Sequence, residues 1–256
     1  MLSYSPQDYK LYSYQDICNG SDGTELPINV YLPSVRNKNS ETAVICIHGG
    51  AWTSSLKKGV KWDGSWMKHN AYLLSTLGYI GLEITHRSVS DVTVNEVAQD
   101  VTAAYEYIHS ALEERHGIKR FFAIGDSAGG HLALMSAFFA DGAIRPERVV
   151  ACNPVSDLTD EKWQLGTDDH AVRKALSPLF FTDSTNTEIL IMHGDLDKTV
   201  PIFYSERLNE HLLSLGCKSE LEVLSGAAHA FILYGYRTPI EIVNSYMEKA
   251  VAFFEN

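Results

Sequence analysis

The chain has 256 residues, of which 45% are hydrophobic and 21% charged, a composition typical of a globular protein with a substantial core. Its formal net charge of −11 disfavours nucleic acid and anionic membrane surfaces as partners, because both select clustered Lys and Arg. The N-terminal residues lack a basic region followed by an apolar stretch, and no segment has the length of a membrane span. We therefore expect one cytoplasmic domain over residues 1–256, with no nucleic-acid or membrane partner.

The cysteines and histidines do not predict a metal site. The four cysteines (Cys18, Cys46, Cys152 and Cys217) are scattered without the spacing of metal ligands, and two of them fall in apolar runs. The histidines show no ligand spacing either. We expect reduced thiols in the core, no metal and no cofactor.

Short apolar runs alternate with helical patterns along the chain. Residues 9–17 and 26–32 alternate apolar and polar side chains around a Gly-rich turn, which predicts an antiparallel hairpin at one edge of a sheet. Strands are then expected near 43–47, 79–84, 121–124, 149–152, 188–192 and 221–224, and helices near 71–77, 94–116, 128–140, 203–215 and from 239 onward.

The helix expected over 94–116 has the clearest ends. Its apolar residues recur every three or four positions, Thr93 and Glu96 form a capping-box pattern, and Gly117 can adopt a left-handed conformation as the stop. A similar box is expected for the last helix, between Thr238 and Glu241.

This alternation predicts an α/β fold: a mostly parallel central sheet with helices on both faces. In such sheets the chemistry lies at the carboxyl ends of the strands. The poorly patterned residues 154–186 are expected to form a short lid or specificity segment within the single domain.

Residues 121–130 read as a strand, a sharp turn and a helix. Within them, Gly125-Asp126-Ser127-Ala128-Gly129 has the G-x-S-x-G pattern of a nucleophile elbow, in which side chains on the flanking glycines would collide as the backbone folds back. The apolar strand before this pattern and the apolar helix after it make it more specific than the bare motif.

Three other polar clusters follow strand ends, at 48–52, 194–201 and 226–231. Together they supply a glycine-rich loop, Ser127, an acidic residue and His229 in chain order. A serine needs a base within hydrogen-bond reach, and that base needs a carboxylate on its second nitrogen. The sequence therefore predicts a serine nucleophile.

These motifs resemble the α/β-hydrolase superfamily. The segments His48-Gly-Gly-Ala-Trp52 and Gly125-Asp-Ser-Ala-Gly-Gly130 are similar to its esterase branch related to hormone-sensitive lipase, and Ser177-Pro-Leu with residues 193–201 resembles small bacterial carboxylesterases. One departure is Thr85-His86-Arg87, where such esterases usually have a tyrosine before the arginine. That difference leaves the subfamily open.

The resemblance implies roles for individual residues. Ser127 is the expected nucleophile and His229 the base; matching the family's HGxxDxxVP pattern assigns the acid to Asp197, with Asp195 as a substitute. Backbone N–H groups of Gly50, Ala51 and Ala128 are expected to form the oxyanion hole. His48 and His193 are expected to brace loops and His131 to be structural. Asp126 is expected to be a turn or helix-start residue, not an acid in the chemistry.

Substrate recognition is expected from aromatic residues in the loops: Trp52, Trp62, Trp66 and Trp163, joined by Tyr234 and Tyr236. The alternative is that these rings only pack the loops together. The expected function is a serine carboxylesterase for short-chain acyl esters, including acetyl or aryl esters of small alcohols or sugars. Amide or peptide hydrolysis of the formamidase or prolyl-peptidase type and a catalytically inert ligand receptor are the alternatives. The oligomeric state stays open, with a homodimer as one option.

Overall fold

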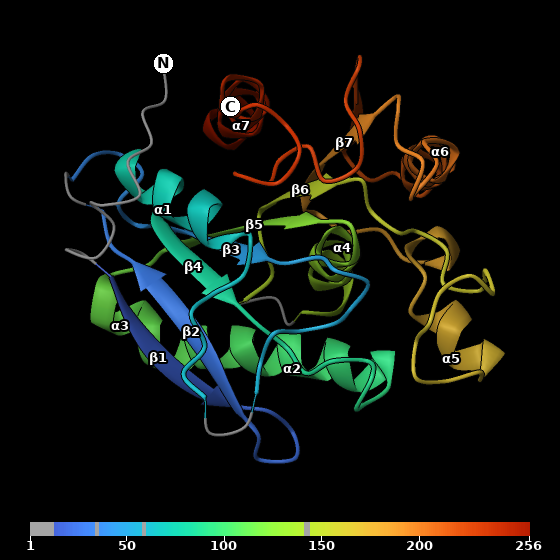
Figure 1. The fold of residues 1–256 in the computed structure, drawn as a ribbon. Helices are drawn as coiled ribbons and strands as arrows, with labels where there is room; N and C mark the ends of the chain where they lie inside the picture. Colours follow the sequence, from blue (N-terminus) through green and yellow to red (C-terminus); the bar gives the residue numbers. More distant parts are fainter. Residues whose placement is uncertain (1–12, 34–35, 58–59, 141–143) are drawn as a thin grey trace.

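The structure is a computed structural model that describes residues 13–33, 36–57, 60–140 and 144–256. Its centre is one sheet with the strand order β1-β2-β4-β3-β5-β6-β7-β8 (Figure 1). All neighbours from β4 to β8 are parallel, whereas β2 pairs antiparallel with β1 and β4. The strands are β1 Ser13–Asn19, β2 Glu25–Tyr31, β3 Thr42–Ile47, β4 Ile80–Ile84, β5 Arg120–Asp126, β6 Arg148–Cys152, β7 Glu188–Gly194 and β8 Ser219–Leu224. The predicted mostly parallel sheet is confirmed.

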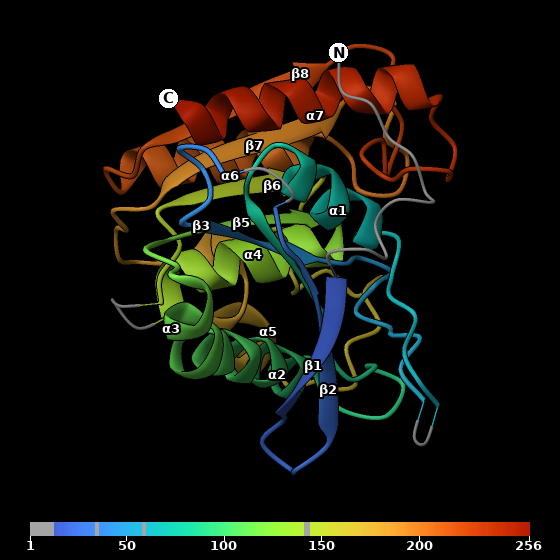
Figure 2. The ribbon, with the colours of Figure 1, turned by 90° about the vertical axis from the view of Figure 1, so that its left-hand side faces the viewer.

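The N-terminal hairpin lies at the edge of the sheet, as predicted. Its two strands pair in register from Ser13 opposite Tyr31 to Asn19 opposite Glu25. Residues 9–12 of the expected first strand lie outside the described residues. The hairpin extends the sheet beyond β4, so β1 forms one edge of the sheet and the parallel strand β8 forms the other (Figure 2).

Helices cover both faces of the sheet. One hydrophobic cluster joins the sheet to α2, α4 and α6, and the other joins it to α1 and α7 on the opposite face. All four cysteines are free and buried. The helices are α1 Lys68–Thr76, α2 Val94–Tyr107, α3 Glu113–His116, α4 Ala128–Phe139, α5 His170–Ala175, α6 Phe203–Ser214 and α7 Ile240–Glu255.

Local sequence signals mark some of the helix ends. The Thr93–Glu96 capping box is present at the start of α2, and Gly117 ends α3 with φ 68°. The continuous helix expected over 94–116 is interrupted by one π turn at Ile108–Leu112, which keeps both of these apolar residues buried. The box expected for the last helix is wrong: Pro239 occupies the capping position with ψ 143°, and no side chain caps α7.

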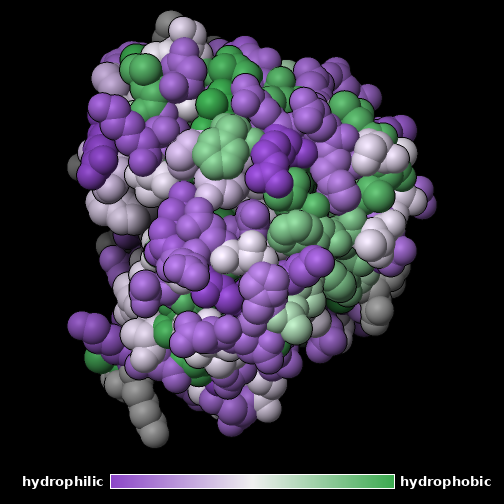
Figure 3. All heavy atoms as spheres, turned by 90° about the vertical axis from the view of Figure 1, so that its right-hand side faces the viewer, coloured by the Kyte–Doolittle hydropathy of each residue, from purple (hydrophilic) through white to green (hydrophobic). Residues whose placement is uncertain are grey.

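The segment expected as a lid, residues 154–186, is mostly irregular and includes α5 and a 3-10 turn at Pro178–Phe180. The buried Arg173 side chain donates to three backbone carbonyls of this segment, those of Leu158, Asp160 and Trp163. The segment therefore has its own internal structure. The surface on this side is mainly hydrophilic, with smaller hydrophobic areas (Figure 3). Among the helices of the described residues, none combines the length and hydrophobicity that crossing a membrane requires.

Candidate active site

The turn between β5 and α4 forces Ser127 into a rare backbone conformation, with φ 57° and ψ −117°. Two glycines make that turn possible. A Cβ on Gly125 would lie 2.1 Å from the carbonyl oxygen of Gly129, and a Cβ on Gly129 would lie 2.1 Å from that of Ile47. The strain is retained because close packing on both sides fixes the turn, as in a nucleophile elbow.

Ser127, His229 and Asp197 form one hydrogen-bonded chain. The Ser127 Oγ lies 3.1 Å from Nε2 of His229, and Nδ1 of His229 lies 2.6 Å from Oδ2 of Asp197. Since Asp197 can only accept from the ring, Nδ1 carries the proton and Nε2 is free to accept from the serine hydroxyl. This tautomer is the one that a general base needs.

The carboxylate at the end of this chain is fixed by the loop that follows β7. Its Oδ1 accepts from the backbone N–H groups of Thr199, at 2.8 Å, and Val200, at 2.9 Å. Burial alone would raise the pKa of Asp197, but the hydrogen bonds from His193, His229 and Val200 outweigh it and hold the pKa well below the ordinary range. Asp197 is therefore ionised at any pH relevant to the site.

Asp195 lies elsewhere. Its Oδ1 accepts from the backbone N–H of Gly226, 2.7 Å away, so the structure brings Asp197 and not Asp195 to the imidazole. His193 braces the acid loop as expected, with Nδ1 2.7 Å from the Ser205 hydroxyl and Nε2 2.8 Å from the carbonyl of Val200.

Two carboxylates act on the imidazole of His229. Burial lowers the pKa of His229, but the hydrogen bond to Asp197 and the charges of Asp126 and Asp197 outweigh burial, so the pKa lies above its ordinary value. The two carboxylates therefore stabilise the protonated form of this ring.

Asp126 is more than the turn residue that the sequence suggested. It is buried, lines the same cavity as Ser127 and His229, and accepts a 3.0 Å hydrogen bond from Nδ2 of Asn153. Burial raises the pKa of Asp126 to about 6, although the charge of His229 opposes this shift. The signal that could have revealed it is a carboxylate placed between a strand and a helix that are both apolar.

The loop after β3 packs directly against the elbow. Three successive residues have positive φ, namely Gly50 at 89°, Ala51 at 53° and Trp52 at 56°. A Cβ on Gly49 would lie 2.5 Å from the carbonyl oxygen of Asp126, so only glycine permits this approach. Gly50 and Ala51 share a cavity wall with Ser127.

His131 holds this loop in place, consistent with the structural role expected for it. The indole Nε1 of the fully buried Trp52 donates to Nδ1 of His131 at 3.1 Å, and Nε2 of His131 lies 2.8 Å from the carbonyl oxygen of Leu176. His131 therefore carries its proton on Nε2 and donates it to that carbonyl. This one ring joins the loop after β3 to the segment expected as a lid.

The loop is also supported from β4. His48 lies 3.1 Å from the Thr85 hydroxyl and stacks on His86 with ring centroids 4.4 Å apart. His86 stands where the resembled esterases usually have tyrosine, so the departure in sequence falls on a residue that braces this loop.

A cavity of about 790 Å³ opens in front of the triad. Trp52, Trp66 and Trp163 line it, and so does Tyr236, whose ring meets Trp66 edge-on with centroids 5.8 Å apart. Trp62 is not brought to this cavity: it is buried, donates to the Ser55 hydroxyl and lines a separate hollow beside the β1–β2 hairpin.

Tyr234 is also buried, and its hydroxyl donates to Asn244. Of the aromatic residues expected at the site, some therefore line the cavity and others only pack loops.

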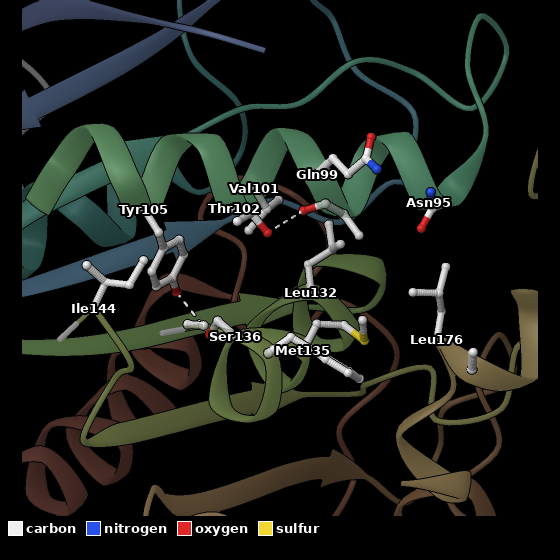
Figure 4. A pocket seen from close by; sticks show the side chains of 14 residues that line it. Asn95, Gln99, Val101, Thr102, Tyr105, Leu132, Met135, Ser136, Ile144 and Leu176 are labelled. Carbon is white, nitrogen blue, oxygen red and sulfur yellow. Dashed lines mark hydrogen bonds between the residues drawn. The ribbon is translucent and has the colours of Figure 1, made fainter. Parts of the chain in front are cut away.

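A second cavity, of about 250 Å³, lies between α2 and α4 (Figure 4). Apolar side chains such as Val101, Leu132 and Met135 line it, and the Tyr105 hydroxyl donates to Ser136 at its inner end. Its lining includes none of Ser127, Asp197 and His229, so it is separate from the cavity in front of Ser127.

Comparison with known proteins agrees with this architecture. The family model BD-FAE matches residues 28–150. Esterase LipQ of Mycobacterium tuberculosis is 27% identical over 91% of this chain, which spans 61% of the length of LipQ. Thermogutta terrifontis esterase 2, in a structure phosphoramylated by tabun, superposes with a TM-score of 0.79 at 22% identity, covering 98% of this chain and 96% of that one. The chain therefore has the α/β-hydrolase fold, and it is similar to esterases that share this fold.

A propionate-bound structure of the Thermogutta protein superposes on this chain with a TM-score of 0.75 at 22% identity, over 97% of this chain and 96% of that one. The likeness extends along nearly the whole chain. Along the sequence, Ser127, Asp197 and His229 follow one another in the order Ser, Asp, His that is typical of catalytic residues in the α/β-hydrolase fold.

Proposed function

We propose that this protein is a serine carboxylesterase that hydrolyses short-chain acyl esters through an acyl-enzyme. The observation that carries the proposal is the chain from the Ser127 hydroxyl through His229 to Asp197, with distances of 3.1 and 2.6 Å. Ser127 and His229 line an open cavity, which also supports the proposal, because a substrate must be able to reach the nucleophile.

In the first half-reaction, the Ser127 oxygen attacks the ester carbonyl carbon while His229 takes the hydroxyl proton on Nε2. Asp197 stabilises the imidazolium. When the tetrahedral intermediate collapses, the C–O bond to the alcohol breaks and His229 returns its proton to the departing oxygen. The acyl group remains on Ser127 as an ester.

In the second half-reaction, a water molecule loses a proton to His229 and attacks the acyl carbon. The intermediate collapses with Ser127 as the leaving group, which is reprotonated by His229, and a carboxylic acid is released.

The backbone is suited to stabilise the negative charge of both intermediates. Ala128 is the first residue of α4, where an N–H has no acceptor within the helix, and the helix dipole adds positive potential at that end. The N–H groups of Gly50 and Ala51 belong to the loop that faces Ser127. We propose these three residues as the oxyanion hole.

The aromatic lining of the cavity supports a ring-shaped leaving alcohol, and the relatives support short acyl groups. The Thermogutta relative has been seen with propionate and with butyrate bound, and also phosphorylated by paraoxon. The exposed residues within 154–186 are mainly polar or charged, which does not favour binding to lipid aggregates. Aryl or sugar esters fit an aromatic wall made by Trp66 and Tyr236.

The test is a chain-length series of p-nitrophenyl esters from acetate to decanoate, measured on the wild type and on Ser127→Ala. Activity that peaks at acetate or butyrate and is lost in the variant supports the proposal. Equal rates in the two proteins refute it.

Matched ester and anilide substrates separate ester from amide hydrolysis. A higher rate on the anilide would replace the proposal by an amidase. Covalent labelling of Ser127 by a fluorophosphonate, absent in Ser127→Ala, excludes an inert receptor. The oligomeric state and the cytoplasmic location remain predictions, with a homodimer as one option.

A further inference from the structure

The one carboxylate within the parallel strand β4 is buried completely. Glu83 lies in the run Ile80–Ile84, whose other members are buried apolar residues or glycine. Its Oε1 accepts from the backbone N–H and the hydroxyl of Ser65, at 2.5 and 2.6 Å, and its Oε2 accepts from Nδ2 of Asn29 at 2.8 Å. A buried carboxylate with three donors is a strong anchor, because losing any donor leaves charge unpaired.

A chain of side-chain amides ends on this carboxylate. Gln15 donates through Nε2 to Oδ1 of Asn29, at 2.9 Å, and to the carbonyl oxygen of Trp62, at 2.8 Å. Asn29 then donates to Glu83. Because Glu83 can only accept when it is ionised, it fixes which way both amides point. The network holds the segment before α1 at two places, Trp62 and Ser65.

The anchored segment is a wall of the substrate cavity. Residues 64–69 all line it, and Trp66, which is 53% exposed, meets the ring of Tyr236 in the same wall. Gly64 has φ 95°, and a Cβ there would lie 2.8 Å from Oε2 of Glu83. The backbone of this wall is thus pressed against the carboxylate that holds it.

We propose that Glu83 is a positioning residue for substrate recognition: through Ser65 and the Asn29–Gln15 amides it sets the position of Trp66, and with it the site for the larger group of the ester. The expected effect on substrate KM rests on the proposed esterase function. The anchoring of Trp66 by Glu83 does not depend on that function.

Protonation of Glu83 weakens the anchor. Burial raises the pKa of this carboxyl to about 7, although the hydrogen bonds from Ser65 and Asn29 and the charge of Lys68 oppose the shift. The titratable groups that face it are Lys68, at the start of α1, and the Cys46 thiol on the neighbouring strand β3. The wall is held most firmly above neutral pH, where the carboxylate is charged.

Two variants test the role of this network. Glu83→Gln keeps the shape but places an NH₂ group against the NH₂ group of Asn29, so one amide must turn and a donor loses its acceptor. The double variant Asn29→Asp/Glu83→Gln restores every bond: the new amide at position 83 accepts from Ser65 and donates to the new carboxylate at position 29, which also accepts from Gln15. Circular dichroism confirms that each protein is folded.

The kinetic measurement compares an ester that reaches the wall, 2-naphthyl acetate, with ethyl acetate, which is too small to reach it. We expect Glu83→Gln to raise KM for 2-naphthyl acetate by about tenfold and to change kcat on ethyl acetate by less than about threefold. In the double variant, the KM for 2-naphthyl acetate should return most of the way to the wild-type value. Equal losses on both esters, or no recovery in the double variant, would overturn the proposal.

Iodide quenching of tryptophan fluorescence tests the anchoring without any substrate. Trp66 is the most exposed of the four tryptophans, and Trp66→Phe identifies its share of the quenching. We expect the Trp66 share to increase in Glu83→Gln, and in the wild type below pH 7, and to return to normal in the double variant at pH 8. Equal quenching in all three proteins overturns the anchoring, even if esters are hydrolysed. If Trp66 quenching in the wild type increases below pH 7 but the protein cleaves no ester, the proposed function is refuted and the anchoring of Trp66 is not.

Discussion

Asp126→Asn should make the folded protein more stable at alkaline pH. The carboxyl of Asp126 is 2% exposed, and burial raises its pKa from 3.8 to about 6. At about 1.4 kcal/mol per pKa unit, a shift of roughly two units corresponds to about 3 kcal/mol. Since the folded-state pKa is the higher one, the wild type has its full stability below the unfolded-state pKa and loses this amount as pH rises through the folded-state pKa. The amide keeps an oxygen for Asn153 and never ionises.

The assay is urea denaturation of the wild type and the variant from pH 3.5 to pH 8. The two free energies of unfolding should converge at the acid end and differ by about 3 kcal/mol above pH 7, with the variant the more stable. Asp183→Asn, at an exposed position, is the matched control and should give no such divergence. Curves for Asp126→Asn that stay parallel to the wild type across this range would refute the reasoning.

The same variant tests the electrostatics of the base. The charge of Asp126 is one of the interactions that raise the pKa of His229. Removing it should move the acid limb of the kcat/KM profile to lower pH, because the imidazole then loses its proton more easily. An acid limb that does not move would show that Asp126 is not coupled to the base.

Three further substitutions probe the triad, the loop after β3 and the elbow. Asp197→Asn should lower kcat by about 10⁴-fold, because the amide no longer holds His229 in the required tautomer; steady-state kinetics at saturating ester measure this. Trp52→Phe leaves Nδ1 of His131 without its donor and removes part of a buried ring, so urea denaturation should show a loss of about 2–4 kcal/mol, together with a lower kcat. Gly129→Ala places a methyl group 2.1 Å from a backbone oxygen of β3 and should cost about 3 kcal/mol or more, seen as a lower melting temperature.

The parallel sheet and the triad could be predicted from the sequence for the same reason. The apolar runs mark the strands, and the ends of these runs mark the loops that carry the three residues. A strand buried on both faces is a continuous apolar run, and the loops after parallel strands meet at one edge. Ser127, Asp197 and His229 each follow such a run, so their meeting required no knowledge of register.

The aromatic residues could not be sorted in the same way. Trp62 and Trp66 are four positions apart in a loop, yet one is buried beside the hairpin and the other faces the cavity. Periodicity tells which side a residue faces only within a helix or strand. In the loop, the sides are decided by hydrogen bonds to distant residues, such as those of Ser65 with Glu83 and of Trp62 with Gln15.

Glu83 itself carried a signal that could have been used. A charged residue within an apolar strand, buried on both faces, must find partners, and partners in a parallel sheet lie on neighbouring strands or on the loops above them. The sequence shows that Glu83 needs donors, but not that they come from β2 and from the loop before α1, because both contacts depend on the strand order.

The His131 ring has a consequence for engineering this protein by exchange of loops. It links Trp52, beside the nucleophile, to the carbonyl of Leu176 in the segment over residues 154–186. Swapping that segment for one from a relative, in order to change which alcohols are accepted, would also change the acceptor on which the ring depends. The segment can therefore be exchanged independently only if the Leu176 carbonyl keeps its position. A graft that preserves the backbone around Leu176 can alter selectivity alone. A graft that moves this backbone would also change turnover on every substrate.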